Sequence, residues 1–176
     1  TYIPTAMAER DKKDKAYEEL SEEQNRLQKK GPTYTGGDFN ARVQTRQSTN
    51  ELCIGTHTFD NEHVTLARQE EGVNENRNLF VAHCISTDTL AMNTFFQKPN
   101  SKKVTFRNCS TTHGPPWTRE TGYEAVDFIS AQHRWKNTVK NVESDTEFID
   151  SDHYPVVASI SIKLKARAFE GKLVGY

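Results

Sequence analysis

The most regular alternation of apolar and polar positions lies near the C-terminus. In residues 156–164, Val156, Ala158 and Ile160 begin a series in which every second side chain is apolar. This is the period of a strand with one buried face. Residues 125–130 are rich in β-branched and aromatic side chains, a composition that also predicts a strand.

Two further strands are predicted where apolar side chains return after turn-forming residues. Residues 34–39 follow the breaker pair Gly31-Pro32, and residues 90–96 follow a predicted short helix at residues 78–83. Residues 104–106 are predicted to form a shorter strand. Loops are predicted for the remaining polar stretches, which are residues 41–78 and 109–123.

Residues 5–30 carry mainly Glu, Lys, Asp and Gln side chains around a few apolar ones. Tyr17, Leu20 and Leu27 recur near helical spacing, and Gly31-Pro32 ends the pattern. We therefore predict a surface helix with a narrow buried stripe. Acidic residues interleave with its lysines, which favours a solvated face over a DNA-binding one.

The length of 176 residues and the mixture of helix and strands indicate one layered α/β domain. Only 34% of the residues are hydrophobic and the mean hydropathy is -0.81, so the predicted core is lean. The net charge of -1 argues against a strongly basic nucleic-acid coat, although a local patch or a metal ion can still recruit a polyanion. No apolar run approaches the ~18 residues that a membrane span needs.

Cysteine and histidine spacing gives no sign of a zinc site. Cys53, Cys84 and Cys109 are odd in number and lack metal-ligand spacing, which favours free thiols in a reducing, intracellular compartment. His57 and His63 have no third ligand near them in the sequence, so we interpret them as isolated loop histidines.

Polar side chains gather at the ends of the predicted strands. Asp38 and Asn40 follow one strand, and Asp152 and His153 precede another. Asp127 lies inside a strand, where a buried carboxylate needs a partner, and His153 is the natural one. Phosphodiester hydrolysis uses a carboxylate that holds or deprotonates water, charged or hydrogen-bonding groups on the phosphate oxygens, and usually a metal ion. A polar turn remains the alternative for Asp38 and Asn40 alone, but the whole set favours phosphodiester chemistry.

These motifs occur in the order found in the endonuclease/exonuclease/phosphatase superfamily, the DNase I-like proteins, and the sequence most resembles the endonuclease domains of non-LTR retrotransposons. The resemblance runs along nearly the whole chain. It rests on Tyr2-Ile3-Pro4, Gly37-Asp38-Phe39-Asn40, Asn93-Thr94-Phe95-Phe96, Thr105-Phe106, Asp127-Phe128-Ile129 and Ser151-Asp152-His153-Tyr154-Pro155.

The resemblance implies a partial DNase I-like two-layer β-sandwich with flanking helices. Residues 1–165 would be the C-terminal portion of such a domain, and residues 166–176 a tail. The first strands of the family, which carry an asparagine and the metal-binding glutamate, would precede Thr1.

The resemblance also implies a metal-dependent phosphodiesterase that nicks DNA, in the nucleus if it is of the retrotransposon type. Asp38 would orient or deprotonate the attacking water. His153, held by Asp127, would stabilise the charge that develops on the phosphate, and Asp152 would assist near the Mg²⁺ ion and the leaving group. The residues implied to bind substrate are Tyr2, Asn40 and Asn93, with Asn40 on the scissile phosphate.

Because the glutamate ligand is missing, two alternative functions remain open. If the chain is part of an enzyme, we expect it to have little or no nicking activity alone, even with Mg²⁺ present. The alternative is a non-catalytic structural or binding subunit of a larger assembly, in which protein partners cover the open half of the fold. An upstream strand with the missing glutamate would favour the enzyme, and unrelated upstream sequence would favour the subunit.

Overall fold

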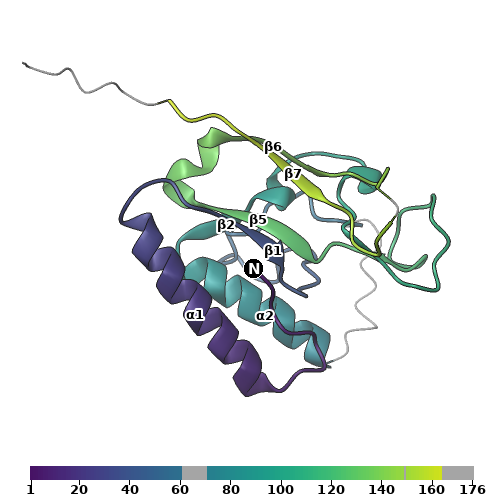
Figure 1. Ribbon diagram of the computed structural model, residues 1–176, viewed down its shortest axis with the longest axis horizontal. Coiled ribbons are helices and arrows are strands. Elements are labelled where there is room, and N and C mark those ends of the chain that lie inside the picture. Colours follow the sequence, from purple (N-terminus) through teal and green to yellow (C-terminus); the bar gives the residue numbers. More distant parts are fainter. Residues whose placement is uncertain (61–70, 149, 164–176) are drawn as a thin grey trace, which may run out of the picture.

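The computed structural model describes residues 1–60, 71–148 and 150–163, which form layered helices and strands (Figure 1). One sheet has the order β1-β5-β2, and a second pairs β6 with β7; all of these neighbours are antiparallel. The strands are β1 (Tyr34–Asp38), β2 (Thr89–Ala91), β5 (Asp127–Gln132), β6 (Val139–Ser144) and β7 (Val156–Ile160).

Two helices cover one face of the first sheet. α1 (Arg10–Gln28) and α2 (Glu71–Ser86) lie side by side there, and the β6–β7 pair lies over the opposite face (Figure 1). The molecule thus has two β layers with flanking helices, as predicted. In the described part of the chain, neither helix is long and apolar enough to cross a membrane.

Three phenylalanines fill the layer between α2 and the sheet. Phe39, Phe80 and Phe128 are buried, with ring centroids 4.7 Å apart for Phe39 and Phe80 and 4.9 Å apart for Phe80 and Phe128. Because side chains alternate along a strand, the residues that precede Phe39 and Phe128 point away from the helices. Those residues are Asp38 and Asp127. The aromatic cluster therefore packs against the helix-facing side of the two segments that carry these carboxylates.

α1 buries the predicted stripe, although the helix is shorter than residues 5–30. Tyr17 is buried and Leu20 is half-buried, while most of the charged side chains are exposed. Lys13 departs from this pattern because it is buried, and its Nζ donates to Glu75 Oε2 at 2.6 Å. This ion pair ties α1 to α2.

The strand predicted at residues 90–96 is wrong after Ala91. β2 ends at Ala91, and Met92–Phe95 form a 3₁₀ turn. Thr94 Oγ1 donates to the Ala91 carbonyl at 2.6 Å and accepts from Gly55 N–H at 2.7 Å. Such side chain to backbone bonds turn the chain where apolar content alone indicates a strand.

α2 begins seven residues before the predicted helix at 78–83, within a segment predicted as loop. Asn76 explains part of this difference. It is fully buried, and its Nδ2 donates to the carbonyls of Pro4 and Asn40, both at 3.1 Å. A tertiary contact therefore places in a helix a residue that usually favours turns.

Two features of the second sheet differ from expectation. β6 was not predicted; a register irregularity between Val139 and Asn141 breaks its period of two. β7 is shorter than the predicted strand because it ends at Ile160, and the predicted apolar face is only partly covered, since Ile160 is 41% exposed and Ile162, just beyond the strand, is 44% exposed. His63, residues 61–70, the last residue of the predicted 156–164 strand and the tail at 166–176 lie outside the described residues.

Candidate active site

The pairing of β1 with β5 places two carboxylates opposite each other. Asp38 and Asp127 are cross-strand partners, and side chains at such positions share one face of the sheet. The N-terminal residues run beside the free edge of β1: Asp38 N–H donates to the Thr1 carbonyl at 3.1 Å, and Ile3 N–H donates to the Asp38 carbonyl at 2.8 Å. Tyr2, which is 64% exposed, is thereby brought next to Asp38.

Asp38 and Asn40 form a local hydrogen-bonded unit. Asp38 Oδ1 accepts from Asn40 N–H at 2.8 Å, and Oδ2 accepts from Asn40 Nδ2 at 3.1 Å. The same Nδ2 donates to the Ile3 carbonyl at 2.7 Å. Asn40 has φ +47°, a left-handed conformation that asparagine tolerates better than most residues. Burial raises the pKa of Asp38 above its usual range, Asp127 adds to this effect, and the bonds from Asn40 and the charge of His153 oppose it.

His153 pairs with Asp127. Its Nδ1 lies 3.0 Å from Asp127 Oδ2, which fixes the ring orientation and favours a proton on Nδ1. The pKa of His153 is raised, chiefly by this hydrogen bond and further by the negative charges of Asp127, Asp38 and Asp152, while partial burial opposes the rise. The Phe106 ring, with its centroid 5.1 Å from that of the imidazole, covers one side of His153.

Asn93 is half-buried and bonded to the backbone of β5. Its Nδ2 donates to the Asp127 carbonyl at 3.1 Å, and its Oδ1 accepts from Ile129 N–H at 2.8 Å. Both ends of the amide are thus engaged by the β5 backbone. Contact of Asn93 with substrate remains a prediction, and in the structure the residue holds β5 in place.

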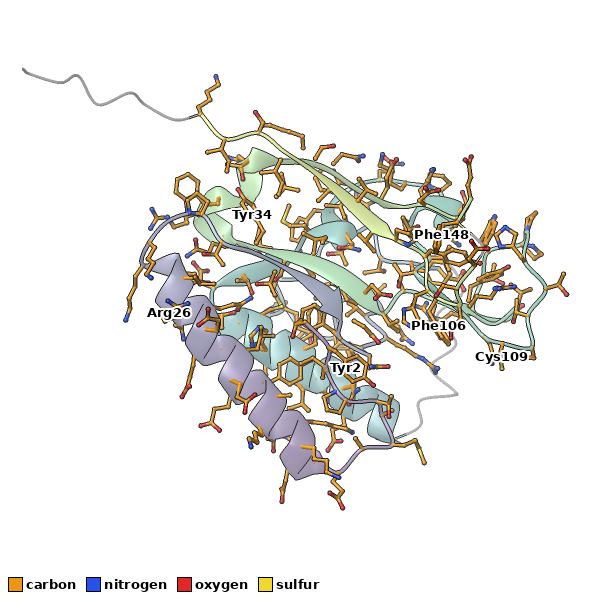
Figure 2. All side chains as sticks on the ribbon, in the orientation of Figure 1. Tyr2, Arg26, Tyr34, Phe106, Cys109 and Phe148 are labelled. Carbon is orange, nitrogen blue, oxygen red and sulfur yellow. The ribbon has the colours of Figure 1, made fainter. Side chains whose placement is uncertain are left out.

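A cavity of about 420 Å³ opens beside the pair. Its lining combines polar atoms of Asp127 and His153 with apolar side chains. Phe148, which is 46% exposed, is one of these apolar side chains. Phe106 and Phe148 both lie toward the right-hand side of the view in Figure 2. The other lining residues are Gly36, Gly37, Phe128, Ile129, Ser151, Tyr154, Pro155 and Val156.

The side chains of this site do not fit a preformed Mg²⁺ centre. The described residues hold no group of three His, Cys, Asp or Glu side chains arranged for a metal ion. Asp127 is engaged by His153 and Asp38 by Asn40, which leaves Asp152, an exposed carboxylate, as a lone candidate ligand. His57 belongs to no such group among the described residues.

The structure brings the residues singled out from the sequence into one region: Asp38, Asn40, Asp127, Asp152, His153, Tyr2 and Asn93 lie on β1, β5 and the segments bonded to them. Phe148, which lines the cavity from an irregular segment, belongs to no recognisable motif or strand pattern. Thr105 belongs to the Thr105-Phe106 motif, and nothing local in the sequence indicates the contacts of its side chain.

Comparison with known proteins identifies the fold. No family model and no curated protein matches the chain. Among solved structures it is similar to NExo, a 3′ phosphatase from Neisseria, solved as an Asp-to-Asn variant bound to a product DNA hairpin. The TM-score is 0.57 at 18% sequence identity, and the match covers 85% of this chain and 53% of that chain. The likeness shows a DNase I-like fold, and the chain spans about half the length of this neighbour.

Proposed function

We propose that the cleft around Asp127 and His153 binds a nucleic-acid phosphate and belongs to a phosphodiesterase that nicks DNA. The observation that carries the proposal is the Asp127–His153 pair, joined at 3.0 Å beside the Asp38–Asn40 unit. A protonated imidazole next to hydrogen-bonding amides suits a phosphate oxygen, because charge-assisted bonds to anions are strong. The bound DNA hairpin of the structural neighbour supports DNA as the substrate class.

In this proposal the chain's own residues supply positioning and proton transfer. The 3.1 Å bond from Asn40 to Asp38 Oδ2 opens when the amide turns to the phosphate, which frees that oxygen for water. Asp38 then accepts a proton as the water oxygen bonds to phosphorus. His153 stabilises the charge on the phosphate oxygens while the bond to the leaving oxygen breaks and that oxygen takes a proton from solvent water. Tyr2 reaches the phosphate from the adjacent segment.

The retrotransposon type and the need for Mg²⁺ rest on the sequence resemblance. Mg²⁺ would supply further charge stabilisation near Asp152 and the leaving group. Since the described residues do not complete such a site, we propose that this chain alone has little or no activity.

Nicking of supercoiled plasmid DNA with Mg²⁺ tests the proposal, with His153→Ala as the control for contaminating nuclease. We expect slow or undetectable nicking by the chain alone and His153-dependent nicking by a longer protein that contains it. Robust nicking by this chain, abolished in His153→Ala, contradicts the proposed weakness. The absence of nicking from both proteins contradicts the enzyme proposal.

One observation favours the alternative, a non-catalytic binding subunit. β7 pairs with β6 alone among the described strands; its Val157 and Ile160 are 54% and 41% exposed, and Ile162, just beyond the strand, is 44% exposed. An apolar strand with an open edge is suited to pairing with a strand of a partner protein. Amide hydrogen exchange separates the two functions: a subunit gains protection across residues 157–162 in its assembly, whereas a catalytic chain shows protection of the Asp38 and His153 segments on adding DNA.

A further inference from the structure

The Asp127–His153 pair is assembled from two segments that are distant in sequence. Asp127 opens β5, and His153 lies in the segment before β7. Between them stands the short β3 (Phe106–Arg107), which forms a bridge from Phe106 to His153 and pairs with β4 (Tyr123–Glu124). The residue just before β3 is Thr105, which is fully buried.

The side chain of Thr105 holds the start of β5. Its Oγ1 accepts two backbone hydrogen bonds, from Val126 N–H at 2.9 Å and from Asp127 N–H at 3.0 Å. A hydroxyl oxygen has two acceptor lone pairs, so both are used. The methyl group of a valine at this position would fill the space but would leave the N–H groups of Val126 and Asp127 without this partner.

The backbone of Thr105 holds the other half of the pair. Its carbonyl accepts from Tyr154 N–H at 2.8 Å, directly after His153, and its own N–H donates to the Glu124 carbonyl at 2.8 Å. One residue is therefore bonded to the segments that carry Asp127 and His153. The distance between Asp127 Oδ2 and His153 Nδ1 depends on the place of both segments relative to Thr105.

We propose that Thr105 is a positioning residue, whose hydroxyl sets the Asp127 backbone at the distance that locks the His153 imidazole into its Nδ1–H form. This inference rests on the proposed role of the pair in phosphate binding. Thr105 acts through the β5 backbone and Asp127.

The test compares Thr105→Val, which keeps the volume and removes the oxygen, with Thr105→Ser, which keeps the oxygen. Thr58→Val is the matched control, because Thr58 is also buried and its hydroxyl has no hydrogen-bond partner among the residues that the structure describes. The readout is the tautomer of His153, from the ¹⁵N chemical shifts of its ring nitrogens at a fixed pH where the ring is neutral.

We expect the wild-type chain, Thr105→Ser and Thr58→Val to show the Nδ1–H form, and Thr105→Val to shift toward Nε2–H. An unchanged tautomer in Thr105→Val, or an equal shift in Thr105→Ser, overturns the inference. If Thr105→Val does not fold, Thr105→Ala makes the same comparison with Thr105→Ser. Affinity for a labelled DNA duplex is measured on the same proteins. Absence of binding by the wild-type chain contradicts the proposed function, while the tautomer still decides the role of Thr105.

Discussion

A substitution of Gly37 tests whether the N-terminal residues pack against β1 beside the candidate site. A Cβ atom at this position would lie 1.9 Å from the Thr1 carbonyl oxygen and 2.6 Å from the Thr1 nitrogen. Both atoms belong to the backbone, so a side-chain rotation does not relieve the clash. Gly37→Ala must therefore push residues 1–3 away from β1.

The cost of this displacement follows from the contacts that are lost. Ile3 is fully buried, and exposing such a side chain costs about 1.5–3 kcal/mol. The two backbone hydrogen bonds that join Asp38 to Thr1 and Ile3 contribute about 0.5–1.5 kcal/mol each. We expect Gly37→Ala to lower the free energy of unfolding by about 3 kcal/mol or more and to move Tyr2 away from Asp38.

Urea unfolding followed by circular dichroism measures the change. Gly31→Ala is the matched control, since a Cβ there has no atom within 4 Å, and its free energy of unfolding should stay within about 0.5 kcal/mol of the wild-type value. If Gly37→Ala is as stable as Gly31→Ala, the N-terminal residues do not pack against β1 as described.

Three further predictions concern stability and reactivity. Arg77 and Glu51 form a buried ion pair, so Arg77→Ala should lower the free energy of unfolding by about 3–5 kcal/mol, against about 0–1 kcal/mol for the exposed Arg26→Ala; equal effects in urea unfolding would refute the buried pairing. The folded-state pKa of His153 lies above its unfolded-state value, so its bond to Asp127 stabilises the chain fully below about pH 6.5 and this contribution is lost as the pH rises through the folded-state pKa. The stability difference between wild type and His153→Gln should shrink over that range, and a difference that grows with pH contradicts the assignment. Cys109 is exposed while Cys53 and Cys84 are buried, so a thiol reagent should label one cysteine rapidly in the folded chain and three after unfolding; fast labelling of all three in the folded chain is the opposing result.

The comparison of sequence and structure separates local signals from tertiary ones. Four site residues can be recognised from the sequence because their motifs and the strand ends near them both have local sequence signals. These residues are Asp38, Asn40, Asp127 and His153. β6 was missed because its register irregularity at Val139–Asn141 removes the period on which recognition depends.

Tertiary hydrogen bonds account for other differences. The turn after β2 is held by Thr94, whose Oγ1 accepts from the distant Gly55 N–H, and part of α2 is held by Asn76, whose partners Pro4 and Asn40 are far away in sequence. Neither contact has a local signature. The same is true of Thr105, whose importance lies in bonds to two distant segments.

Binding of a fluorescent DNA duplex, measured by anisotropy at low salt and acidic to neutral pH, tests the central claim most directly. A charge-assisted hydrogen bond is worth about 1.5–3 kcal/mol, so His153→Ala should weaken binding by about tenfold or more. His133→Ala is the matched control, because this exposed histidine lies in the 3₁₀ turn (His133–Thr138) that follows β5, whereas Asp127 opens the strand. The account predicts that His133→Ala binds as the wild-type chain does and that wild-type binding weakens as the pH rises through the raised pKa of His153. Equal affinity of His153→Ala and the wild-type chain contradicts it.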